Sequence, residues 1–362
     1  MCSKSHMSAG TLQVVQKLAP GGIETLALAL AAALPGNNAI FSLEGEATAL
    51  RTAWSSAGAA QIDIEAFGKH PGIHLSLVLE LAGRMRELRP RALITHHIGP
   101  LLYAGAAARL AGVPRLAHVE HDIWHFDAPR RRALARFAIK ALRPDYIVLS
   151  QAAAANQRRL LGVDQITTIP NGVDVARFVP GDAQAARHRF DLDPQRIWIG
   201  SAGRLETVKG HDVLIDAMAL LPDRQVHLAI AGDGSQRQAL QARAMARGVA
   251  NRVHFLGLCT DMPALLPAFD VFCLPSRAEG LPLSVLEAQA VGIPVVASDV
   301  GALREALCPG VSCLVPAANP GALAKGITEV LTRNVRASPR QVVVANFNWD
   351  QTVSAYRKLI GV

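Results

Sequence analysis

The stretch of residues 269–298 constrains the fold of this chain more than any other part of it. It reads FDVFCLPS, RAEGLP, LSVLEAQAVG and IPVVAS in turn: an apolar run, a polar loop, a helical segment and a second β-branched run. Pro282 at the start of the helical segment and Gly292 just after its end are typical helix boundaries. The stretch therefore predicts a β–loop–α–β unit of an open α/β sheet.

Two glutamates lie in this unit, Glu279 in the loop and Glu287 about a turn and a half inside the helical segment. Both can face the carboxyl edge of a parallel sheet, where open α/β folds bind their ligands. The free N–H groups of Gly280, Leu281 and Leu283 point toward the same space, and a helix N-terminus attracts anions. Carboxylates that accept hydrogen bonds from hydroxyl groups, beside a loop that favours anions, suit a ligand that is part polyol and part phosphate. A nucleotide sugar is such a ligand.

Strand-like and helical patterns alternate along the whole chain. Strand-like runs occur first at residues 12–18, 39–43, 61–67, 92–95, 115–120, 146–149 and 166–169, and again at 197–202, 225–231, 253–256, 271–274, 294–297 and 312–315. Helical patterns fill the intervals, notably at 24–34, 74–88, 101–110, 128–141 and 151–161. This alternation predicts parallel sheets with helices on both faces, and 362 residues exceed one ordinary core. We therefore expect two doubly wound α/β domains in tandem, at residues 11–175 and 176–345, with a cleft between their sheet edges.

The two ends of the chain fall outside these domains. Ser5, His6 and Met7 resemble an expression scar, so residues 1–10 are expected to be a tag or a disordered N-terminus. Residues 346–362 contain an amphipathic pattern that predicts a C-terminal helix, with Val353 and Tyr356 on its apolar side.

The net charge of +8 is concentrated in two basic clusters. One cluster consists of Arg84, Arg86, Arg89 and Arg91, and the other of Arg130, Arg131, Arg132, Arg136, Lys140 and Arg143 on a helical pattern. Such clusters can hold a protein on an anionic membrane surface, and a solvated helix face is the alternative. Aromatic residues are scarce and no recognition motif accompanies the charge, so no nucleic-acid partner is expected.

The sequence also indicates a compartment. No apolar run approaches the roughly 18 residues that a membrane span needs, and the N-terminus does not resemble a signal peptide. The five cysteines include no C-x-x-C pair, which is typical of a reducing compartment and of a chain without a zinc knuckle. We expect a cytoplasmic protein, either free or peripheral on the inner face of the cytoplasmic membrane.

A loop with two cations follows the first strand-like run of the second series. Arg204 and Lys209 lie in this loop, ahead of a helix that begins at His211. At the carboxyl edge of a sheet they can hold a diphosphate, the arginine by its planar fork and the lysine as a point charge; solvated loop cations are the alternative.

In the first series, Gly21 and Gly22 either let the backbone approach a ligand at a helix N-terminus or form a tight turn.

Histidines gather where two strand-like runs of the first series end. His121 and Asp122 are expected at the carboxyl edge of the first sheet, and four further histidines lie nearby in the sequence: His96, His97, His118 and His125. A zinc site is conceivable, but no H-E-x-x-H or comparable ligand spacing is present. The Asp-Leu-Asp motif at residues 191–193 precedes a strand instead of following one. The sequence therefore predicts no metal site.

Taken together, these segments resemble the retaining GT-B glycosyltransferases of family 4, a large group of bacterial sugar transferases. The match covers nearly the whole chain, and its pieces come in the family's order: GGIE, VEHD, DYIVLS, IPNGVD, GRLETVKG, GDG, FLG and PSRAEGLPLSVLEAQAVGIPVVAS. The last piece, with seven residues between its two glutamates, is the most specific. The resemblance implies a GT-B fold, with two tandem doubly wound Rossmann-like domains facing a cleft and a last helix that crosses back onto the N-terminal domain.

The resemblance implies a catalytic group of four residues. Arg204 and Lys209 would hold the diphosphate of the donor, Glu279 would contact hydroxyls of the transferred sugar, and His121 would lie near that sugar. One departure from the family's pattern concerns the acceptor side, because Glu120 precedes His121 where a small or hydroxyl residue is common.

The remaining site residues would bind the nucleotide sugar. Glu287 would accept hydrogen bonds from both ribose hydroxyls, and the backbone around Gly257 and Leu258 would contact the base. The diphosphate would also be held by the backbone N–H groups of Gly21, Gly22, Gly280, Leu281 and Leu283.

The activity that the resemblance implies is retaining, metal-independent transfer of a sugar. The donor would be a UDP- or GDP-sugar, and the acceptor a hydroxyl of a lipid-linked or oligosaccharide substrate in bacterial surface polysaccharide assembly. No cofactor is expected besides the nucleotide diphosphate sugar as co-substrate. Two alternatives are a sugar-nucleotide epimerase of the same fold, and a non-catalytic subunit that only binds the nucleotide sugar.

Overall fold

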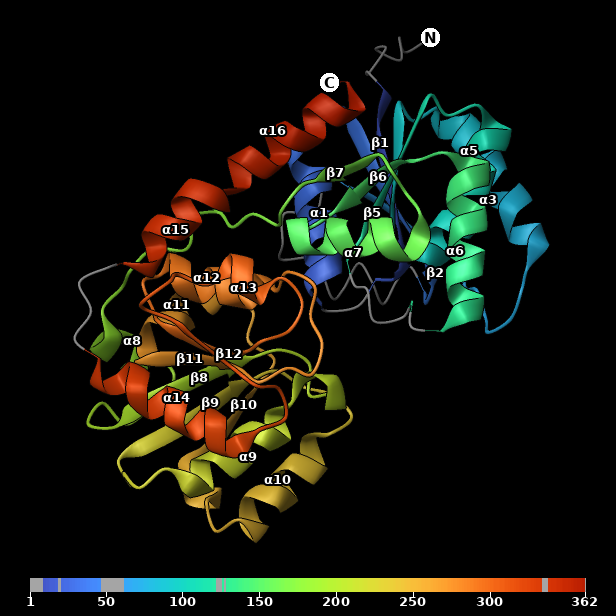
Figure 1. Ribbon diagram of the computed structural model, residues 1–362. Coiled ribbons are helices and arrows are strands. Elements are labelled where there is room, and N and C mark those ends of the chain that lie inside the picture. Colours follow the sequence, from blue (N-terminus) through green and yellow to red (C-terminus); the bar gives the residue numbers. More distant parts are fainter. Residues whose placement is uncertain are drawn as a thin grey trace. The chain divides into compact units, whose positions relative to one another are not determined.

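The computed structural model describes residues 9–18, 21–46, 62–121, 126, 128–333 and 338–361. The chain forms two compact units: the first runs up to Pro170 and resumes at Thr352, and the second is Asn171–Gln351. Each unit is an α/β structure with its own parallel sheet (Figure 1). Most of the expected tag, residues 1–8, lies outside the described residues.

The first unit contains a seven-stranded sheet in the order β3-β2-β1-β4-β5-β6-β7, counted over its described residues. All neighbouring strands in this sheet run parallel. The strands are β1 Ala9–Lys17, β2 Asn37–Glu44, β3 Asp63–Ala66, β4 Ala92–His96, β5 Arg115–Glu120, β6 Asp145–Val148 and β7 Ile166–Thr168.

Helices cover both faces of this sheet. They are α1 Gly22–Ala33, α3 Leu75–Leu88, α4 Ile98–Pro100, α5 Ala106–Ala111, α6 Pro129–Leu142 and α7 Gln151–Leu161. The terminal α16, Trp349–Ile360, belongs to this unit from Thr352 on. Apolar residues of α3, α5 and α6 share one buried cluster with β1, β2, β4 and β5, and Figure 1 shows these three helices as one group. Helix α1 packs against β1, β2 and β3 through a second cluster. Because side chains alternate along a strand, Leu12 and Val14 of β1 belong to the first cluster and Val15 to the second.

The helix predicted at residues 101–110 is more complex than its pattern suggested. It begins earlier, with α4 at Ile98, continues as a π-turn at Leu101–Gly105 and ends as α5. Pro100 is tolerated there because the first residues of a helix need no N–H partner. At the other end of the unit, α16 is held by hydrogen bonds from Arg357 to the Ala33 carbonyl and from Arg115 to the Leu359 carbonyl.

The second unit contains a six-stranded parallel sheet in the order β10-β9-β8-β11-β12-β13, counted over its described residues. Its strands are β8 Ile197–Ala202, β9 Val226–Ala231, β10 Val253–Gly257, β11 Val271–Leu274, β12 Val295–Ser298 and β13 Cys313–Val315. Its helices are α8 Ala183–Arg189, α9 His211–Leu220, α10 Arg237–Ala246, α11 Met262–Leu265, α12 Leu283–Ala290, α13 Leu303–Ala306, α14 Pro320–Thr332 and α15 Pro339–Asn346, with 3₁₀ turns at Thr207–Lys209, Ala250–Arg252 and Leu266–Ala268.

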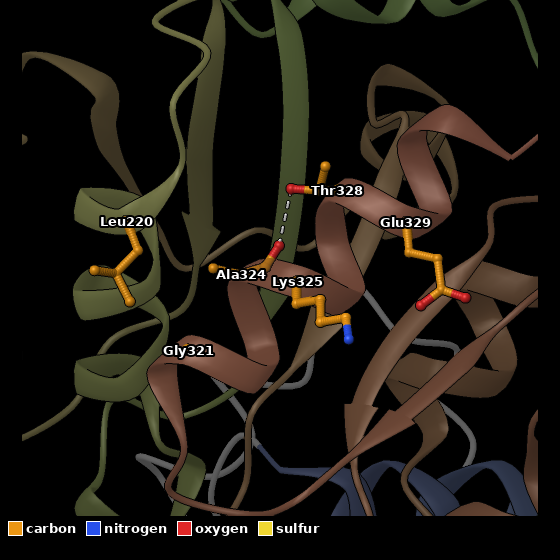
Figure 2. A pocket seen from close by; sticks show the side chains of 6 residues that line it. All are labelled: Leu220, Gly321, Ala324, Lys325, Thr328 and Glu329. Atoms are coloured by element: carbon orange, nitrogen blue, oxygen red, sulfur yellow. Dashed lines mark hydrogen bonds between the residues drawn. The ribbon is translucent and has the colours of Figure 1, made fainter.

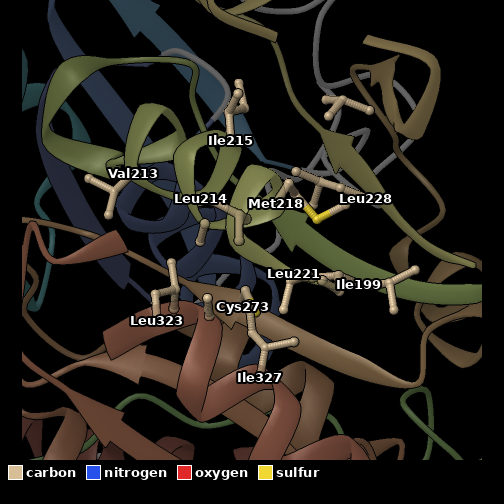
Figure 3. Packing of buried hydrophobic residues seen from close by; sticks show 14 of the residues in the cluster. Ile199, Val213, Leu214, Ile215, Met218, Leu221, Leu228, Cys273, Leu323 and Ile327 are labelled. Carbon is tan, nitrogen blue, oxygen red and sulfur yellow. The ribbon is translucent and has the colours of Figure 1, made fainter. Parts of the chain in front are cut away.

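The core of the second unit lies between its central strands and helices α9 and α14. Figure 3 shows Leu214 and Met218 of α9 and Ile327 of α14 among the buried side chains around Cys273 of β11. The fully buried Cys273 therefore packs in this core, as its place in an apolar run predicts. Gly200 of β8 leaves room for Phe269, whose ring a Cβ at that position would meet at 2.0 Å.

The predicted α/β class and the predicted strands are confirmed. Every expected strand-like run is a strand, with ends that shift by at most three residues, and the run predicted at 61–67 is described only as Asp63–Ala66. Helix α12 follows Pro282 and ends before Gly292, whose φ of 91° is a left-handed conformation that favours glycine. Over the part of the chain that the structure describes, no helix combines the length and the apolar character of a membrane span.

Candidate functional site

Glu279 lies at the centre of a charged cluster in the second unit. One of its carboxylate oxygens accepts a hydrogen bond from Lys209 Nζ at 2.6 Å and another from Ser276 Oγ at 2.6 Å. The Glu279 side chain is 8% exposed and that of Lys209 is 21% exposed. Lys209 follows β8 and Glu279 follows β11, and these strands are neighbours in the sheet. The structure thus brings together a predicted cation and a predicted carboxylate at the carboxyl edge, as an ion pair.

Two glycines allow the loops around this cluster to approach each other closely. Gly210, directly after Lys209, has φ 68°, and a Cβ there would meet the Pro275 carbonyl oxygen at 2.0 Å. Gly301 has φ 57°, and a Cβ there would meet the Glu279 carbonyl oxygen at 2.0 Å. Both positions therefore require glycine for conformation and for space.

A second pair of charges, which the sequence reasoning missed, holds the same two loops together. Arg277 Nη1 and Nη2 donate to the two carboxylate oxygens of Asp212 at 2.8 and 2.7 Å, and Nη1 also donates to the Thr207 carbonyl. This hydrogen-bonded pairing keeps the pKa of Asp212 below its ordinary value. Arg277 stands inside the PSRAEGLP segment and Asp212 lies just after GRLETVKG, but nothing in the sequence indicates that residues 65 positions apart pair.

Arg204, the other predicted cation, lies in the loop after β8 and is exposed. Its carbonyl accepts a hydrogen bond of 2.8 Å from the Glu206 N–H, but within the described residues its guanidinium makes no hydrogen bond or ion pair and is available to a ligand. The neighbouring Glu206 is held by hydrogen bonds from the backbone N–H and the hydroxyl of Ser235, which lower the pKa of Glu206. The two predicted cations are therefore in different states: Lys209 is paired and Arg204 is open.

The loop Gly280–Leu281 leads into the N-terminus of α12. The first N–H groups of a helix have no partner within the helix, so those near Leu283 suit an anion. Leu281 is buried, and its carbonyl accepts a hydrogen bond of 2.7 Å from the side-chain amide of the buried Asn171. Asn171 was not predicted as a site residue, although it stands in the IPNGVD turn.

Glu287 is partly buried on α12. Burial raises the pKa of its carboxyl to about 7, and the nearby Arg177 opposes this rise. Near neutral pH this group is therefore divided between its acid and its carboxylate forms. Hydroxyl groups of a ligand that donate to it would favour the carboxylate.

Gly257 and Leu258 lie at a different place on the same edge. Gly257 is the last residue of β10 and Leu258 follows it, and β10 is separated from β11 by β9 and β8. The carbonyl oxygen of Gly257 accepts a hydrogen bond from the Gly232 N–H at 2.7 Å, whereas the Leu258 side chain is 66% exposed. The structure therefore does not bring these two residues beside Glu279, since neighbouring strands are about 4.8 Å apart and three steps separate β10 from β11.

In the first unit, Gly21 and Gly22 lie at the start of α1. Gly21 precedes the helix with an extended backbone (φ −174°), and its carbonyl accepts hydrogen bonds from the Thr25 N–H and hydroxyl. Neither glycine has a positive φ. The alternative of a tight turn that needs a positive φ is therefore wrong, and close approach of the backbone remains the prediction for this pair.

His121 follows β5 and is 6% exposed. Its Nε2 lies 2.9 Å from Nδ1 of His96, whose Nε2 lies 2.9 Å from Oε1 of Gln13. Burial lowers the pKa of His96 to about 3 and that of His121 well below its ordinary value. Both imidazoles are therefore neutral at physiological pH.

The remaining described histidines of this group, His97 and His118, hydrogen-bond to other partners, although the His97 ring also packs edge-on against the His121 ring with centroids 5.3 Å apart. His118 Nδ1 lies 3.0 Å from the Thr95 hydroxyl, and His97 Nδ1 lies 3.0 Å from Oε1 of the buried Glu120. No group of three or more histidine, cysteine or acidic side chains with metal-binding geometry occurs in the described part of the chain. Asp122 and His125 lie outside the described residues.

A hollow of about 510 Å³ in the second unit contains none of the predicted site residues. Figure 2 shows it between Leu220 and helix α14, where it is lined by Gly321, Ala324, Lys325, Thr328 and Glu329. Leu220 is the last residue of α9, so the hollow lies at the opposite end of that helix from Lys209.

Two doubly wound parallel units in one chain, with charged side chains behind the carboxyl ends of their strands, define the GT-B class of proteins. Family models support this assignment on both halves: residues 20–177 match Glycosyltransferase Family 4 and residues 182–346 match Glycosyl transferases group 1. The chain belongs to this family, the glycosyl transferases group 1 of family 4.

Individual proteins resemble the chain in sequence. It is 37% identical over 211 residues to a D-inositol 3-phosphate glycosyltransferase of Mycolicibacterium vanbaalenii. This alignment covers 53% of this chain and 46% of the relative. It is 39% identical over 152 residues to the lipopolysaccharide core biosynthesis mannosyltransferase LpsB of Rhizobium meliloti, and this alignment covers 40% of this chain and 43% of the relative. The matched part thus spans about half the length of these curated relatives.

The fold resembles that of HepE from Anabaena, which was crystallised in complex with UDP and glucose. The TM-score is 0.84 at 22% identity, over 98% of this chain and 100% of that chain. This likeness supports the GT-B fold for the whole chain.

Proposed function

We propose that this chain is a retaining glycosyltransferase. It moves a sugar from a nucleotide diphosphate sugar to a hydroxyl of a lipid-linked or oligosaccharide acceptor, without a divalent metal ion. The observation that carries the proposal is the cluster of Lys209, Ser276 and Glu279 behind adjacent strands, with the N-terminus of α12 directly after it. A cation, a carboxylate and a helix N-terminus at one sheet edge suit the parts of such a donor, the diphosphate and the sugar hydroxyls.

The mechanism follows from the charge that develops when the anomeric bond breaks. The departing diphosphate gains negative charge, and the sugar gains positive charge. Lys209, the open Arg204 and the N–H groups at the start of α12 would stabilise the diphosphate, and one preset donor of this kind is typically worth roughly 10²–10³ in rate. Glu279 would hold hydroxyls of the transferred sugar, and His121 would hydrogen-bond near that sugar without acting as a nucleophile.

Related proteins support a nucleotide-sugar donor. One structural relative was solved with UDP and glucose, and one sequence relative is named as a mannosyltransferase of lipopolysaccharide core synthesis. We propose a UDP- or GDP-sugar as the donor and an acceptor of bacterial surface polysaccharide assembly.

Two substitutions test the proposal. Glu279→Gln and Arg204→Ala should each reduce sugar transfer at least a hundredfold while the circular dichroism spectrum stays unchanged, because each removes one charge that meets the donor. Arg224→Ala is the matched control, since this exposed arginine lies before β9 at the opposite edge of the sheet. Full turnover in Glu279→Gln contradicts the proposal, and a new sugar nucleotide formed without acceptor indicates an epimerase.

We also propose that helix α6 docks on an anionic membrane. Leu134 and Phe137 are 46% and 70% exposed on it, and their spacing places them on one outward stripe. Arg131, Arg136 and Lys140 are also exposed on α6, which carries no acidic residue. The other basic cluster is partly neutralised, because Arg84 pairs with Glu65 and Glu87. An apolar stripe within basic charge is typical of helices that bind anionic lipid surfaces.

Sedimentation with vesicles tests the membrane proposal. The chain should sediment with vesicles of phosphatidylcholine and phosphatidylglycerol and stay in solution with phosphatidylcholine alone. Phe137→Ser should weaken this binding, whereas Met245→Ser, at an exposed apolar residue of α10, should not. Equal binding by both variants would mean that α6 is not the docking surface.

A further inference from the structure

Three buried polar side chains form a chain of hydrogen bonds beneath the end of the first unit's sheet. Gln13 of β1, His96 of β4 and His121 after β5 are 0%, 0% and 6% exposed. Gln13 Oε1 lies 2.9 Å from His96 Nε2, and His96 Nδ1 lies 2.9 Å from His121 Nε2. The rings of the two histidines are stacked, with centroids 5.2 Å apart.

The strand register explains why these three residues meet. Gln13 lies beside Ile94 in the pairing of β1 with β4, and His96 is two residues further along β4. Because side chains alternate along a strand, Ile94 and His96 share a face with Gln13. His96 lies beside Val119 in the pairing of β4 with β5, so His121, two residues further on, falls on the same side.

With the Gln13 amide in the orientation that the structure gives it, proton accounting along this chain leaves one arrangement, in which Gln13 Nε2 has no hydrogen-bond partner among the described residues. The side-chain oxygen of Gln13 can only accept a hydrogen bond, so His96 Nε2 must carry a proton and donate it. His96 is neutral because burial strongly disfavours its charged form. Its Nδ1 therefore carries a lone pair, which accepts the proton of His121 Nε2. Since His121 is neutral for the same reason, its own Nδ1 has no proton.

We infer that Gln13 and His96 are positioning residues that lock His121 in the Nε2–H tautomer, with Nδ1 as a hydrogen-bond acceptor toward the substrate. This inference rests on the proposed function, which places the donor sugar near His121. An acceptor nitrogen can receive a hydrogen bond from a sugar hydroxyl but cannot donate one to a phosphate oxygen. His121 would therefore recognise a hydroxyl of the sugar, and the diphosphate would be left to the cations of the second unit.

The neighbouring charged group does not take part in this chain. Glu120 lies on the opposite face of β5, where Oε1 is 3.0 Å from His97 Nδ1 and Oε2 is 3.6 Å from His118 Nε2. The unusual residue before His121 is thus paired with other histidines. Within the described residues the ring of His121 makes no hydrogen bond other than the one to His96.

Nitrogen NMR of the full chain labelled with ¹⁵N-histidine tests the tautomer directly. The His121 signals are assigned by their loss in His121→Gln. In the wild-type protein we expect a protonated Nε2 and an unprotonated Nδ1, and the opposite pattern overturns the inference without the need for any variant.

A matched pair of glutamine variants tests the role of Gln13. Gln13→Leu removes the acceptor for His96, so His121 should shift to a mixture of tautomers. Gln157→Leu is the control, because Gln157 is equally buried in the same unit but bonds the Tyr146 hydroxyl; it should leave the His121 signals unchanged. An unchanged tautomer in a folded Gln13→Leu protein also overturns the inference.

Kinetics separate this inference from the proposed function. Gln13→Leu should lower kcat by about tenfold or more with little change in the donor KM, since a wrong tautomer weakens a contact that matters in the transition state. If His121 has the expected tautomer but no nucleotide sugar is turned over, the proposed function is wrong and the inference about the tautomer is correct. If turnover is found and His121 is protonated on Nδ1, the inference is wrong and the proposed function is supported.

Discussion

Glu287 shows how burial changes the chemistry of a single carboxyl group. Its pKa of about 7 lies well above the ordinary value of 4.5, chiefly because water is excluded from it, and Arg177 only partly offsets this. A group whose folded-state pKa is raised binds more protons in the folded state between these two values. The free energy of unfolding therefore falls as pH rises from about 4.5 to about 7, and the loss is complete above that range.

Glu287→Gln should therefore stabilise the unliganded protein at pH 8. A rise of 2.5 in pKa corresponds to about 3 kcal/mol at most, and partial exposure of the group reduces this to about 1–3 kcal/mol. Urea unfolding at pH 8 and at pH 4.5 measures the effect, which should vanish at the lower pH. The same variant should bind the nucleotide sugar more weakly, because an amide accepts hydroxyl hydrogen bonds less strongly than a carboxylate does.

Glu206 provides the control with the opposite sign. Its pKa is lowered by hydrogen bonds from Ser235, so its contribution to stability is present above its unfolded pKa and is lost as pH falls. Glu206→Gln should therefore weaken the fold at pH 8. A similar change of the same sign in both variants would show that burial of Glu287 is not the cause.

At the scale of elements, the loop between β11 and α12 is held from several sides. Arg277 fixes its first part to Asp212 and to the Thr207 carbonyl, Gly301 packs against the Glu279 carbonyl, and Asn171 donates to the Leu281 carbonyl. A loop fixed in this way keeps its N–H groups and its carboxylate in place before a ligand arrives. Such preset groups need no reorganisation when charge develops.

Gly301→Ala should displace this loop and abolish donor binding. Its Cβ would lie 2.0 Å from the Glu279 carbonyl oxygen, so the backbone of the loop has to move. Gly310→Ala is a matched control: Gly310 also has a positive φ, of 77°, but nothing lies within 4 Å of its Cβ. Both variants should lose about 1–2 kcal/mol of stability from backbone strain, and calorimetric titration with the nucleotide sugar should distinguish them.

Asn171→Ala should loosen the same loop from its other end. The variant leaves the buried Leu281 carbonyl without its donor, which should cost about 1–3 kcal/mol of stability and raise the donor KM. Asn251→Ala, at an exposed asparagine of the same unit, is the control. An unchanged KM in Asn171→Ala would mean that the loop does not depend on this hydrogen bond.

At the scale of the whole molecule, the chain contains two α/β units with separate hydrophobic clusters. The large cluster of the second unit lies directly under the loops that carry Lys209 and Glu279, on strands β8 and β11. Each sheet places polar residues at its carboxyl ends, because every parallel strand ends at the same edge. The fold therefore gathers residues from distant parts of the sequence without any local signal.

A panel of nucleotide sugars scored by thermal stabilisation should identify the donor. A ligand present at 100 times its Kd adds about 2.7 kcal/mol to the free energy of unfolding, which is large enough to raise the Tm measurably. Arg224→Ala should respond as the wild-type protein does, and Glu279→Gln should respond much less. If no UDP- or GDP-sugar stabilises the wild-type chain, the proposed donor class is wrong.

The strands, the helices and the family of this protein could be predicted from its sequence. Alternating strand-like and helical patterns of hydrophobic residues, together with boundary residues such as Pro282 and Gly292, predicted the strands and helices. They could do so because these signals act over a few neighbouring residues. The spacing of Glu279 and Glu287 was visible for the same reason, since both lie in one β–loop–α–β unit.

Which side chains meet could be seen only in the folded protein. Lys209 pairs with Glu279 across 70 positions, and Gln13 reaches His96 across 83, because β8 lies beside β11 and β1 beside β4. The order and register of strands depend on long-range packing and leave no local pattern in the sequence. Burial is likewise a property of the packed molecule, which is why the pKa of about 7 for Glu287 could not be read from its neighbours in the chain.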